Sequence, residues 1–350
     1  MPSTDLGRAP IGPEGRSVVR WSPLQRWVRG RVGVLVLRRL AWTVPVLLST
    51  VVVTFALMHL APGNPWDQSY GDEGPKVQLS KTAISQLNAK YGLDRPWWQQ
   101  LGIYIRNVAR FDFGNSYRFQ GEPVRHLIGQ RLGPTFTLAA IALVVVIPVG
   151  VTLGVLAALR HNSRLDYTLT GLATLAASVP NFVIGIFLIL ILSVGLNRAT
   201  DGRFFLPSGG FALDERLIMP LITLTVLPIS FMARLTRAST LDTLRQDHVR
   251  TARAKGVVRR RVVIRHVLKN ALVPVVTTMG PLFVFLISGT VVIETLFQVP
   301  GLGGAFVQAV GARDYPVILA SAMVYALVVV AANLVVDVLY VILDPRMRPT

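Results

Sequence analysis

Long apolar stretches follow one another along most of the chain after residue 39. A helix rises about 1.5 Å per residue, so it needs roughly 20 apolar residues to cross about 30 Å of hydrocarbon. Six stretches meet this requirement and predict six transmembrane helices, at 40–60, 132–159, 167–196, 217–233, 271–293 and 317–343. The fourth is the shortest and contains Pro220 and Pro228, which a spanning helix tolerates only where neighbours satisfy the freed carbonyls.

The pattern predicts an all-α membrane protein with a basic tail and two large polar segments between its helices. The first apolar stretch is too long for the apolar region of a signal peptide, so we expect it to be retained. The Arg-, Pro- and Gly-rich leader has the composition of a mostly disordered tail. The expected parts are a cytoplasmic tail (1–38), a first helix (39–61), an extracytoplasmic segment (62–131), a five-helix core (132–343) with a cytoplasmic loop (234–270), and a cytoplasmic tail (344–350).

Composition supports this class and removes several kinds of chemistry. Hydrophobic residues make up 52% of the chain and charged residues 15%, and the mean hydropathy is +0.51, which is unlike a water-soluble domain. The absence of cysteine excludes disulfides, thiolate metal sites and cysteine nucleophiles. The five histidines are scattered, and none has a second histidine four residues away with a carboxylate between, so we expect no metal site.

The net charge of +18 is distributed unevenly along the chain. Residues 1–39 contain eight basic and two acidic residues, and residues 234–269 contain eleven and two. The segments 198–216 and 294–316 are close to neutral. Because loops on the cytoplasmic side carry the excess of Lys and Arg, both termini are predicted to be cytoplasmic. The basic excess thus indicates orientation in a lipid bilayer, and we expect no nucleic-acid partner.

The extracytoplasmic segment is rich in aromatic residues. They are Trp66, Tyr91, Trp97, Trp98, Tyr104, Phe111, Phe113 and Tyr117. Two interpretations stay open: an interfacial cap whose aromatic side chains lie at the membrane surface, and a docking surface for an extracytoplasmic partner.

The cytoplasmic loop predicts two short helices with a bend at Gly256. Val249, Ala252 and Gly256 recur at helical spacing, and the residues after Gly256 repeat apolar and basic positions every three or four residues. One interpretation is a basic amphipathic hairpin on an anionic membrane surface. The small residues Ala252, Ala254 and Gly256 instead favour a site where another protein approaches the backbone.

Residues 250–256, Arg-Thr-Ala-Arg-Ala-Lys-Gly, resemble the cytoplasmic motif of ABC importer membrane subunits, Glu-Ala-Ala followed by three residues and Gly. Arg250 and Thr251 depart from the general motif but match the dipeptide and oligopeptide branch, as does the Asn-Ala-Leu-x-Pro at 270–274; Lys269 stands where many relatives have Pro. Other stretches agree in order and spacing with the first, B-type permease subunit of that branch: 59–65 (with Asn64 for Asp), 91–96, 111–116, 294–303, 314–316 and 343–346.

This resemblance implies a type I ABC importer permease fold in a bacterial or archaeal plasma membrane, with a cytoplasmic coupling helix. Implied partners are a second homologous permease subunit, two cytoplasmic ABC ATPase subunits or domains, and an extracytoplasmic peptide-binding protein. The dipeptide Gly-Lys does not occur, so the chain has no P-loop; it is not expected to be an enzyme or to bind a cofactor, and partner subunits would use ATP and Mg²⁺. The implied ATPase-coupling residues are Asp247, Arg250, Thr251, Ala252, Arg253, Ala254, Lys255 and Gly256.

Four polar residues on or beside the predicted spans are candidates for the translocation pathway: Asn181, Glu294, Asn333 and Asp337. Ionisable residues inside a membrane are functional candidates by default. Asp337 lies about two turns from the inner end of its span and could instead pair with basic residues near the cytoplasmic loop, and Glu294 could simply mark the end of the fifth span. The two asparagines could serve only to hold helices together.

Two other functions stay open at this point. Nickel permeases resemble this subunit closely, so the cargo could be nickel rather than di- or oligopeptides. A carrier driven by an ion gradient is the alternative from a different class. The presence of a single carboxylate well inside an apolar stretch and the absence of an evident inverted repeat disfavour a carrier.

Overall fold

The computed structural model describes the backbone of residues 23–63, 65–66, 80–118 and 121–343, and the side chains of these ranges between residues 33 and 338. Regular structure in the described ranges is helical. The helices are α1 (Pro23–Leu60), α2 (Lys81–Tyr91), α3 (Trp97–Val108), α4 (Val124–Leu159), α5 (Arg164–Ser178), α6 (Asn181–Leu188), α7 (Leu196–Ala199), α8 (Ile218–Leu244), α9 (Asp247–Ala254), α10 (Arg259–Val262), α11 (Leu268–Ala271), α12 (Val273–Leu296), α13 (Leu302–Ala312) and α14 (Tyr315–Leu343). Two π-helical segments, η1 (Ile189–Gly195) and η3 (Val263–Val267), and the 3₁₀ turn η2 (Glu215–Leu217) complete the described elements.

Six helical segments of the described chain are long and apolar enough to cross a membrane, which confirms the predicted class and number. They are Gly33–Leu60, Val124–Leu159, Asn181–Ala199, Glu215–Leu244, Val273–Leu296 and Tyr315–Val338. The fifth and sixth begin within two residues of the predicted starts at 271 and 317. The first ends at Leu60, as predicted.

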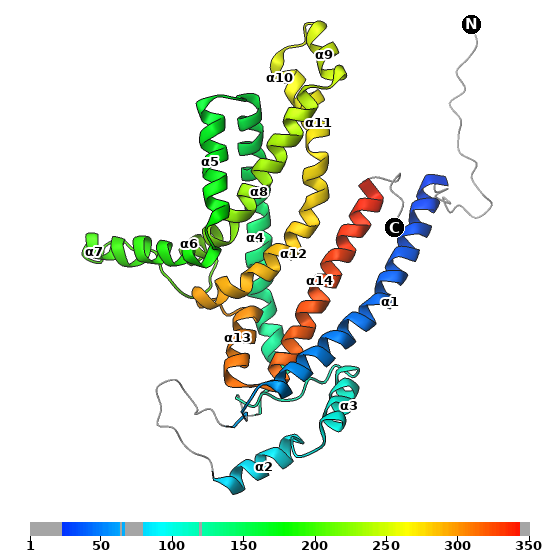
Figure 1. Cartoon of the computed structure of the whole chain (residues 1–350), viewed down its shortest axis with the longest axis vertical. Helices are drawn as coiled ribbons and strands as arrows, with labels where there is room; N and C mark the ends of the chain where they lie inside the picture. Colours follow the sequence, from blue (N-terminus) through cyan, green and yellow to red (C-terminus); the bar gives the residue numbers. More distant parts are fainter. Residues whose placement is uncertain (1–22, 64, 67–79, 119–120, 344–350) are drawn as a thin grey trace, which may run out of the picture.

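The third span is not the single helix that was predicted at 167–196. Helix α5 ends at Ser178, Val179 is extended with φ −104° and ψ 127°, and α6 starts directly after Pro180. A proline ring clashes with a helical conformation of the residue before it, which explains the break. Figure 1 shows α6, η1 and α7 running across the direction of α5. The stretch long enough to span is Asn181–Ala199.

Other helix limits also differ from the predicted ones. Residues 23–38, expected to belong to a disordered tail, form the start of α1, whereas 1–22 and the tail at 344–350 lie outside the described residues. Helix α4 starts at Val124, before the predicted limit at 132, because the polar residues of its first turns continue the helix that the apolar stretch begins.

Helix α8 corrects the predicted start of the cytoplasmic loop at 234. It continues through Pro228 to Leu244, so Arg234 and Arg237 lie on a helix rather than in a loop. Long basic side chains can stay in a helix at a membrane boundary because their charged ends reach toward water. A further helix, α13, occupies the region expected to be an outer loop at 294–316.

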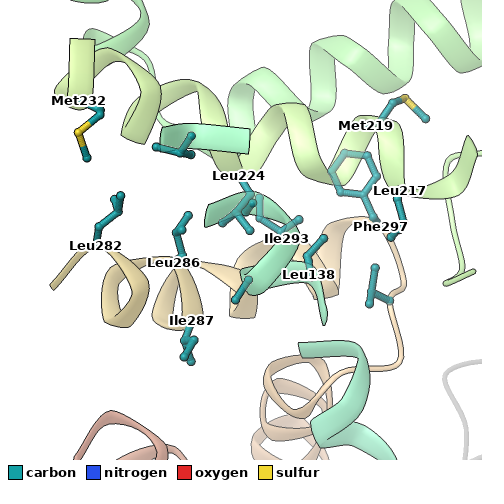
Figure 2. Close-up of a cluster of buried hydrophobic side chains, with 14 of the residues drawn as sticks. Leu138, Leu217, Met219, Leu224, Met232, Leu282, Leu286, Ile287, Ile293 and Phe297 are labelled. Carbon is teal, nitrogen blue, oxygen red and sulfur yellow. The ribbon is translucent and has the colours of Figure 1, made fainter. Parts of the chain in front are cut away.

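Helices α4, α8 and α12 enclose the main hydrophobic core (Figure 2). Leu138 of α4, Leu224 and Met232 of α8, and Leu286 and Ile293 of α12 are almost fully buried there. The backbones of α4 and α8 approach closely at two glycines. A Cβ on Gly154 would lie 2.5 Å from the Ala233 carbonyl oxygen, and one on Gly150 would lie 2.6 Å from the Met232 Cβ. Small residues at such positions let membrane helices pack backbone against backbone.

Helices α1 and α14 lie side by side and slant away from this core (Figure 1). Many large apolar side chains on α1 are exposed, for example Leu37 (69%) and Trp42 (62%), as expected for a helix that faces lipid. Helices α2 and α3 lie at one end of the molecule and α9 to α11 at the opposite end (Figure 1). The two polar segments predicted on opposite membrane sides are therefore at opposite ends of the bundle.

Candidate functional site

The loop between α8 and α12 is an ordered unit with a sharp turn at Gly256. Gly256 has φ +74°, where a side chain is strained, and no described atom lies within 4 Å of a Cβ placed on it. The amide of Gly256 donates to the Arg253 carbonyl (3.0 Å), and that of Val257 donates to the Ala252 carbonyl (3.2 Å). These two bonds form a Schellman motif that ends α9. The predicted bend at Gly256 is confirmed.

A small hydrophobic cluster fixes α9 against the second half of the loop. Val249, Ala252, Val262, Val267 and Ala271 are buried together. Ala252 is only 7% exposed and points into this cluster, so it does not lie on the surface where another protein could approach. Its predicted part in seating a partner is therefore corrected: Ala252 is small because α9 must pack closely on its own loop.

The other predicted coupling residues form the exposed side of α9 and its end: Asp247, Arg250, Thr251, Arg253, Ala254, Lys255 and Gly256. Asp247 precedes Arg250 by one turn, with 3.8 Å between Oδ1 and Nη1. The Thr251 hydroxyl donates to the Asp247 carbonyl (2.9 Å). Ala254 is the small exposed residue of this helix. The surface that a partner could contact is therefore basic, and at Ala254 the short side chain leaves the backbone accessible.

Two hydrogen bonds join the loop to the long helices. The Ser239 hydroxyl of α8 donates to the Ala271 carbonyl of α11 (2.8 Å). Arg259 Nη2 at the start of α10 donates to the Leu159 carbonyl at the end of α4 (3.3 Å). A cation at a helix C-terminus satisfies an otherwise unpaired carbonyl and meets the negative end of the helix dipole. The second half of the loop is thereby attached to α4 and α8.

An ion pair that was not identified from the sequence lies next to this connection. The Asp166 carboxylate of α5 is 2% exposed and accepts from Arg237 of α8 twice, from Nε (2.6 Å) and Nη2 (2.7 Å). The Asn162 amide also donates to it (3.0 Å). The hydrogen bonds from Arg237 outweigh burial and lower the pKa of Asp166 well below its usual range. The pair holds the α4–α5 turn against α8.

One sequence signal pointed to part of this arrangement. Ser163 followed three residues later by Asp166 is the pattern of a helix start, and the Ser163 hydroxyl accepts from the Asp166 amide (3.3 Å). Nothing in the sequence pairs Asp166 with Arg237, because the two residues are brought together only by the packing of α5 on α8.

Glu294 of α12 lies in a buried contact between helices. It is 1% exposed and sits at the start of α13, where Oε2 accepts from the Gly304 amide (3.0 Å) and Oε1 accepts from the Thr135 hydroxyl (2.7 Å). The Thr135 oxygen in turn accepts from the Leu302 amide (2.9 Å). A carboxylate at a helix N-terminus satisfies its free amides and meets the positive end of its dipole. Glu294 therefore joins α12, α13 and α4.

The remaining pathway candidates are dispersed. Asp337 of α14 forms an ion pair with Arg39 of α1, with 2.5 Å between Oδ2 and Nη2. Asp337 is thus paired with a basic residue, and that residue comes from α1. Asn181 is the first residue of α6, its Oδ1 is buried, and no hydrogen-bond partner for that atom occurs in the described part of the chain. Asn333 is half-buried on α14, one turn before Asp337. The structure does not bring the four into one site.

Comparison with known proteins fixes the family. Residues 150–349 match the family described as binding-protein-dependent transport system inner membrane component. The chain belongs to this family. It is therefore a multi-pass membrane component of a transport system, which agrees with its six membrane-length helices.

Curated relatives match almost over their full length. The oligopeptide transport system permease protein AppB of Bacillus subtilis is 38% identical over 316 residues, which cover 89% of this chain and 98% of the relative. The dipeptide transport system permease protein DppB of Lactococcus lactis is 36% identical over 313 residues, with the same coverage.

A solved structure supports the fold. A chain of the MetNI methionine ABC transporter, in an inward-facing conformation, superposes with a TM-score of 0.53 at 18% identity and covers 64% of this chain and 100% of its own length. The chain thus has the fold of an ABC importer permease.

Proposed function

We propose that this chain is the membrane subunit through which di- and oligopeptides enter a cell, powered by ATP hydrolysis in partner subunits. The alignment to two curated peptide permeases over 98% of their length supports this proposal most strongly, since the similarity extends through all the spans and both polar segments. A second homologous permease would complete the pathway, and an extracytoplasmic binding protein would deliver the peptide.

The exposed side of α9 is the proposed contact with an ATPase subunit. Arg250 and Lys255 would pair with acidic residues of a groove in that subunit, and Ala254 would permit a close approach. The hydrophobic cluster beneath α9 makes the loop move as a unit. The bonds from Ser239 and Arg259 would pass its displacement to α8, α11 and α4. Coupling of this kind requires a stiff element that connects two arrangements of the spans.

The opposite end is the proposed contact with the binding protein. Asp314 is 2% exposed and accepts from the amides of Tyr117 (3.1 Å) and Arg118 (3.3 Å), which attaches the extracytoplasmic segment to the turn before α14. Trp97 and Trp98, both 59% exposed, are available on α3. This orientation places both termini and α9 in the cytoplasm, as the positive charge of the loops indicates.

The test is uptake into vesicles that contain the complete complex and its binding protein. Labelled peptides of graded length should accumulate only when ATP is supplied. Uptake of nickel instead of peptides would assign the other cargo, and accumulation driven by an ion gradient without ATP would refute the proposal.

A pair of variants tests the part played by α9. Gly256→Trp should lower peptide-stimulated ATP hydrolysis and uptake about tenfold, because the chain can no longer turn at the end of α9. Gly202→Trp is the matched control, since Gly202 also has positive φ (+81°) but lies in a connection outside the loop. Full coupling in Gly256→Trp would refute α9 as the coupling element.

A further inference from the structure

Positive charge on the loop between α8 and α12 is not balanced by acidic residues. No acidic residue occurs between Asp247 and Glu294. Eight basic residues lie in the same region, and all are exposed: Arg250, Arg253, Lys255, Arg259, Arg260, Arg261, Arg265 and Lys269. Among the described residues, the ion pair found for this group is the one between Arg250 and Asp247. The loop therefore presents a positive surface that attracts anions.

The turn at Gly256 divides this surface into two parts of different character. The part before it, α9, is exposed through polar side chains and Ala254. The part after it also exposes two large apolar side chains, Val258 (72%) just before α10 and Ile264 (56%) in η3. Arg260 and Arg261 precede Ile264 by four and three residues, which places the three on the same side of this helical segment. Basic and apolar side chains together are typical of a helix that lies on an anionic membrane.

The contact between Arg259 and the Leu159 carbonyl places α10 at the level where a membrane surface would be. Leu159 ends the apolar helix α4, and exposed Arg160 and Arg164 follow in the turn to α5. Figure 1 shows α10 at the same end of the molecule as this turn. The arginines of both segments therefore lie at the boundary where the hydrocarbon ends and lipid headgroups begin.

We infer that α10 and η3 bind the headgroups of anionic phospholipids, with Ile264 inserted among them, while α9 remains free for a protein partner. The orientation of this surface toward the inner leaflet rests on the proposed function. An acidic groove of the ATPase is the competing occupant, but it would not require an exposed Ile264 beside the end of a membrane helix. Because the hydrophobic cluster joins the two halves of the loop, bound lipid would restrain the whole loop at the membrane surface.

The chain contains no cysteine, so a single cysteine introduced into it is labelled without background from this chain, and the partner subunits are used in cysteine-free form. The complete complex carrying Ile264→Cys, labelled with a fluorophore, is placed in vesicles of phosphatidylcholine alone or mixed with phosphatidylglycerol. Lipids with a nitroxide on the headgroup serve as quenchers. Thr251→Cys on α9 is the matched control. Quenching at 264 that exceeds quenching at 251, and that increases with phosphatidylglycerol, is the expected result. Equal quenching at both positions would overturn the inference.

A charge variant separates lipid from protein as the occupant. Arg260→Gln with Arg261→Gln should weaken the phosphatidylglycerol-dependent quenching at 264 roughly twentyfold or more, because each lost cation weakens association with an anionic surface about fivefold. The same variant should retain its ATPase subunits on purification. Loss of those subunits with unchanged quenching would assign the surface to the ATPase and overturn the inference. ATP-driven peptide uptake by the wild-type complex in phosphatidylcholine reports separately on the proposed function.

Discussion

The buried pair of Asp166 and Arg237 offers the sharpest test of how this structure is held together. Asp166→Asn preserves the shape of the side chain but removes its charge. The variant replaces the two hydrogen bonds from Nε and Nη2 of Arg237 to a carboxylate with at most one to an uncharged amide oxygen. It also leaves a guanidinium group whose side chain is only 26% exposed without its counter-charge.

The expected loss of stability follows from burial. Removing one partner of a buried ion pair costs about 3–5 kcal/mol, because the remaining charge is left uncompensated. Arg237 is partly accessible, so water can solvate it in the variant, and we expect the lower end, about 3 kcal/mol. The matched control is Asp214→Asn. Asp214 and Arg216 are 3.7 Å apart and nearly half exposed, so this substitution should cost less than about 1 kcal/mol.

Denaturant unfolding of the purified complex measures the free energy of unfolding of each variant. Limited proteolysis of the folded complex measures how accessible the α4–α5 turn is. The turn at residues 160–163 should become susceptible in Asp166→Asn and stay protected in Asp214→Asn. Because the folded-state pKa of Asp166 is lowered, the contribution of the pair is fully present above about pH 4, the usual range of Asp, and is lost as pH falls through the lower folded value. The difference in unfolding free energy between Asp166→Asn and the wild type should therefore become smaller only below about pH 4. Equal losses of unfolding free energy in Asp166→Asn and Asp214→Asn would refute the conclusion that the buried pair contributes more than the exposed one.

Three further predictions concern single contacts. Gly154→Ala should destabilise the protein by about 1–3 kcal/mol in denaturant unfolding because its Cβ meets α8, whereas Gly129→Ala, on the same helix with open space around it, should be neutral or stabilising. Glu294→Ala should cost about 2–4 kcal/mol, since it leaves buried partners such as Thr135 and the start of α13 unsatisfied; an unchanged melting temperature would contradict this. Gly256→Ala should cost about 1–2 kcal/mol from its positive φ, measured by thermal unfolding, and a larger loss would indicate contacts that the structure lacks.

Apolar length was sufficient to predict where most of the chain crosses the membrane. The ends of α12 and α14 agree with their apolar stretches because each helix must satisfy its own backbone in lipid, whatever its neighbours. Gly256 was predicted as a bend for a similarly local reason, since only glycine adopts its φ of +74° without strain.

Local pattern failed where a neighbour decides the outcome. Hydropathy continues through Val179 and Pro180, but the proline breaks the helix, and the packing of α6 on α8 and α12 fixes its new direction. Pro228 did not end α8, because the helix is supported on several sides by α4, α5 and α12. Pro180 interrupts a helix whereas Pro228 does not, so the effect of a proline on these helices could not be predicted from the sequence.

The polar candidates show the same division. The sequence identified Asp337, the carboxylate well inside an apolar stretch, and Glu294, just beyond the predicted fifth span, because an acidic residue in or beside hydrocarbon is costly. It could not tell that Glu294 caps α13 or that Asp337 pairs with Arg39, since the first contact depends on how the chain turns between α12 and α13 and the second on the packing of α1 against α14. It also interpreted the small side chain of Ala252 as room for a partner, whereas the cluster around Val262 buries that residue within the loop.

The sequence by itself determined the class, the number of spans, the charged loop and the family resemblance, because these depend on residue type and local spacing. The tertiary structure alone decided which charges are compensated and which remain on the surface. Asp166 and Arg237 neutralise each other across two helices, whereas the arginines of α10 find no acidic partner in the described chain. The physical reason is that compensation depends on distance in space, which follows from how the helices pack.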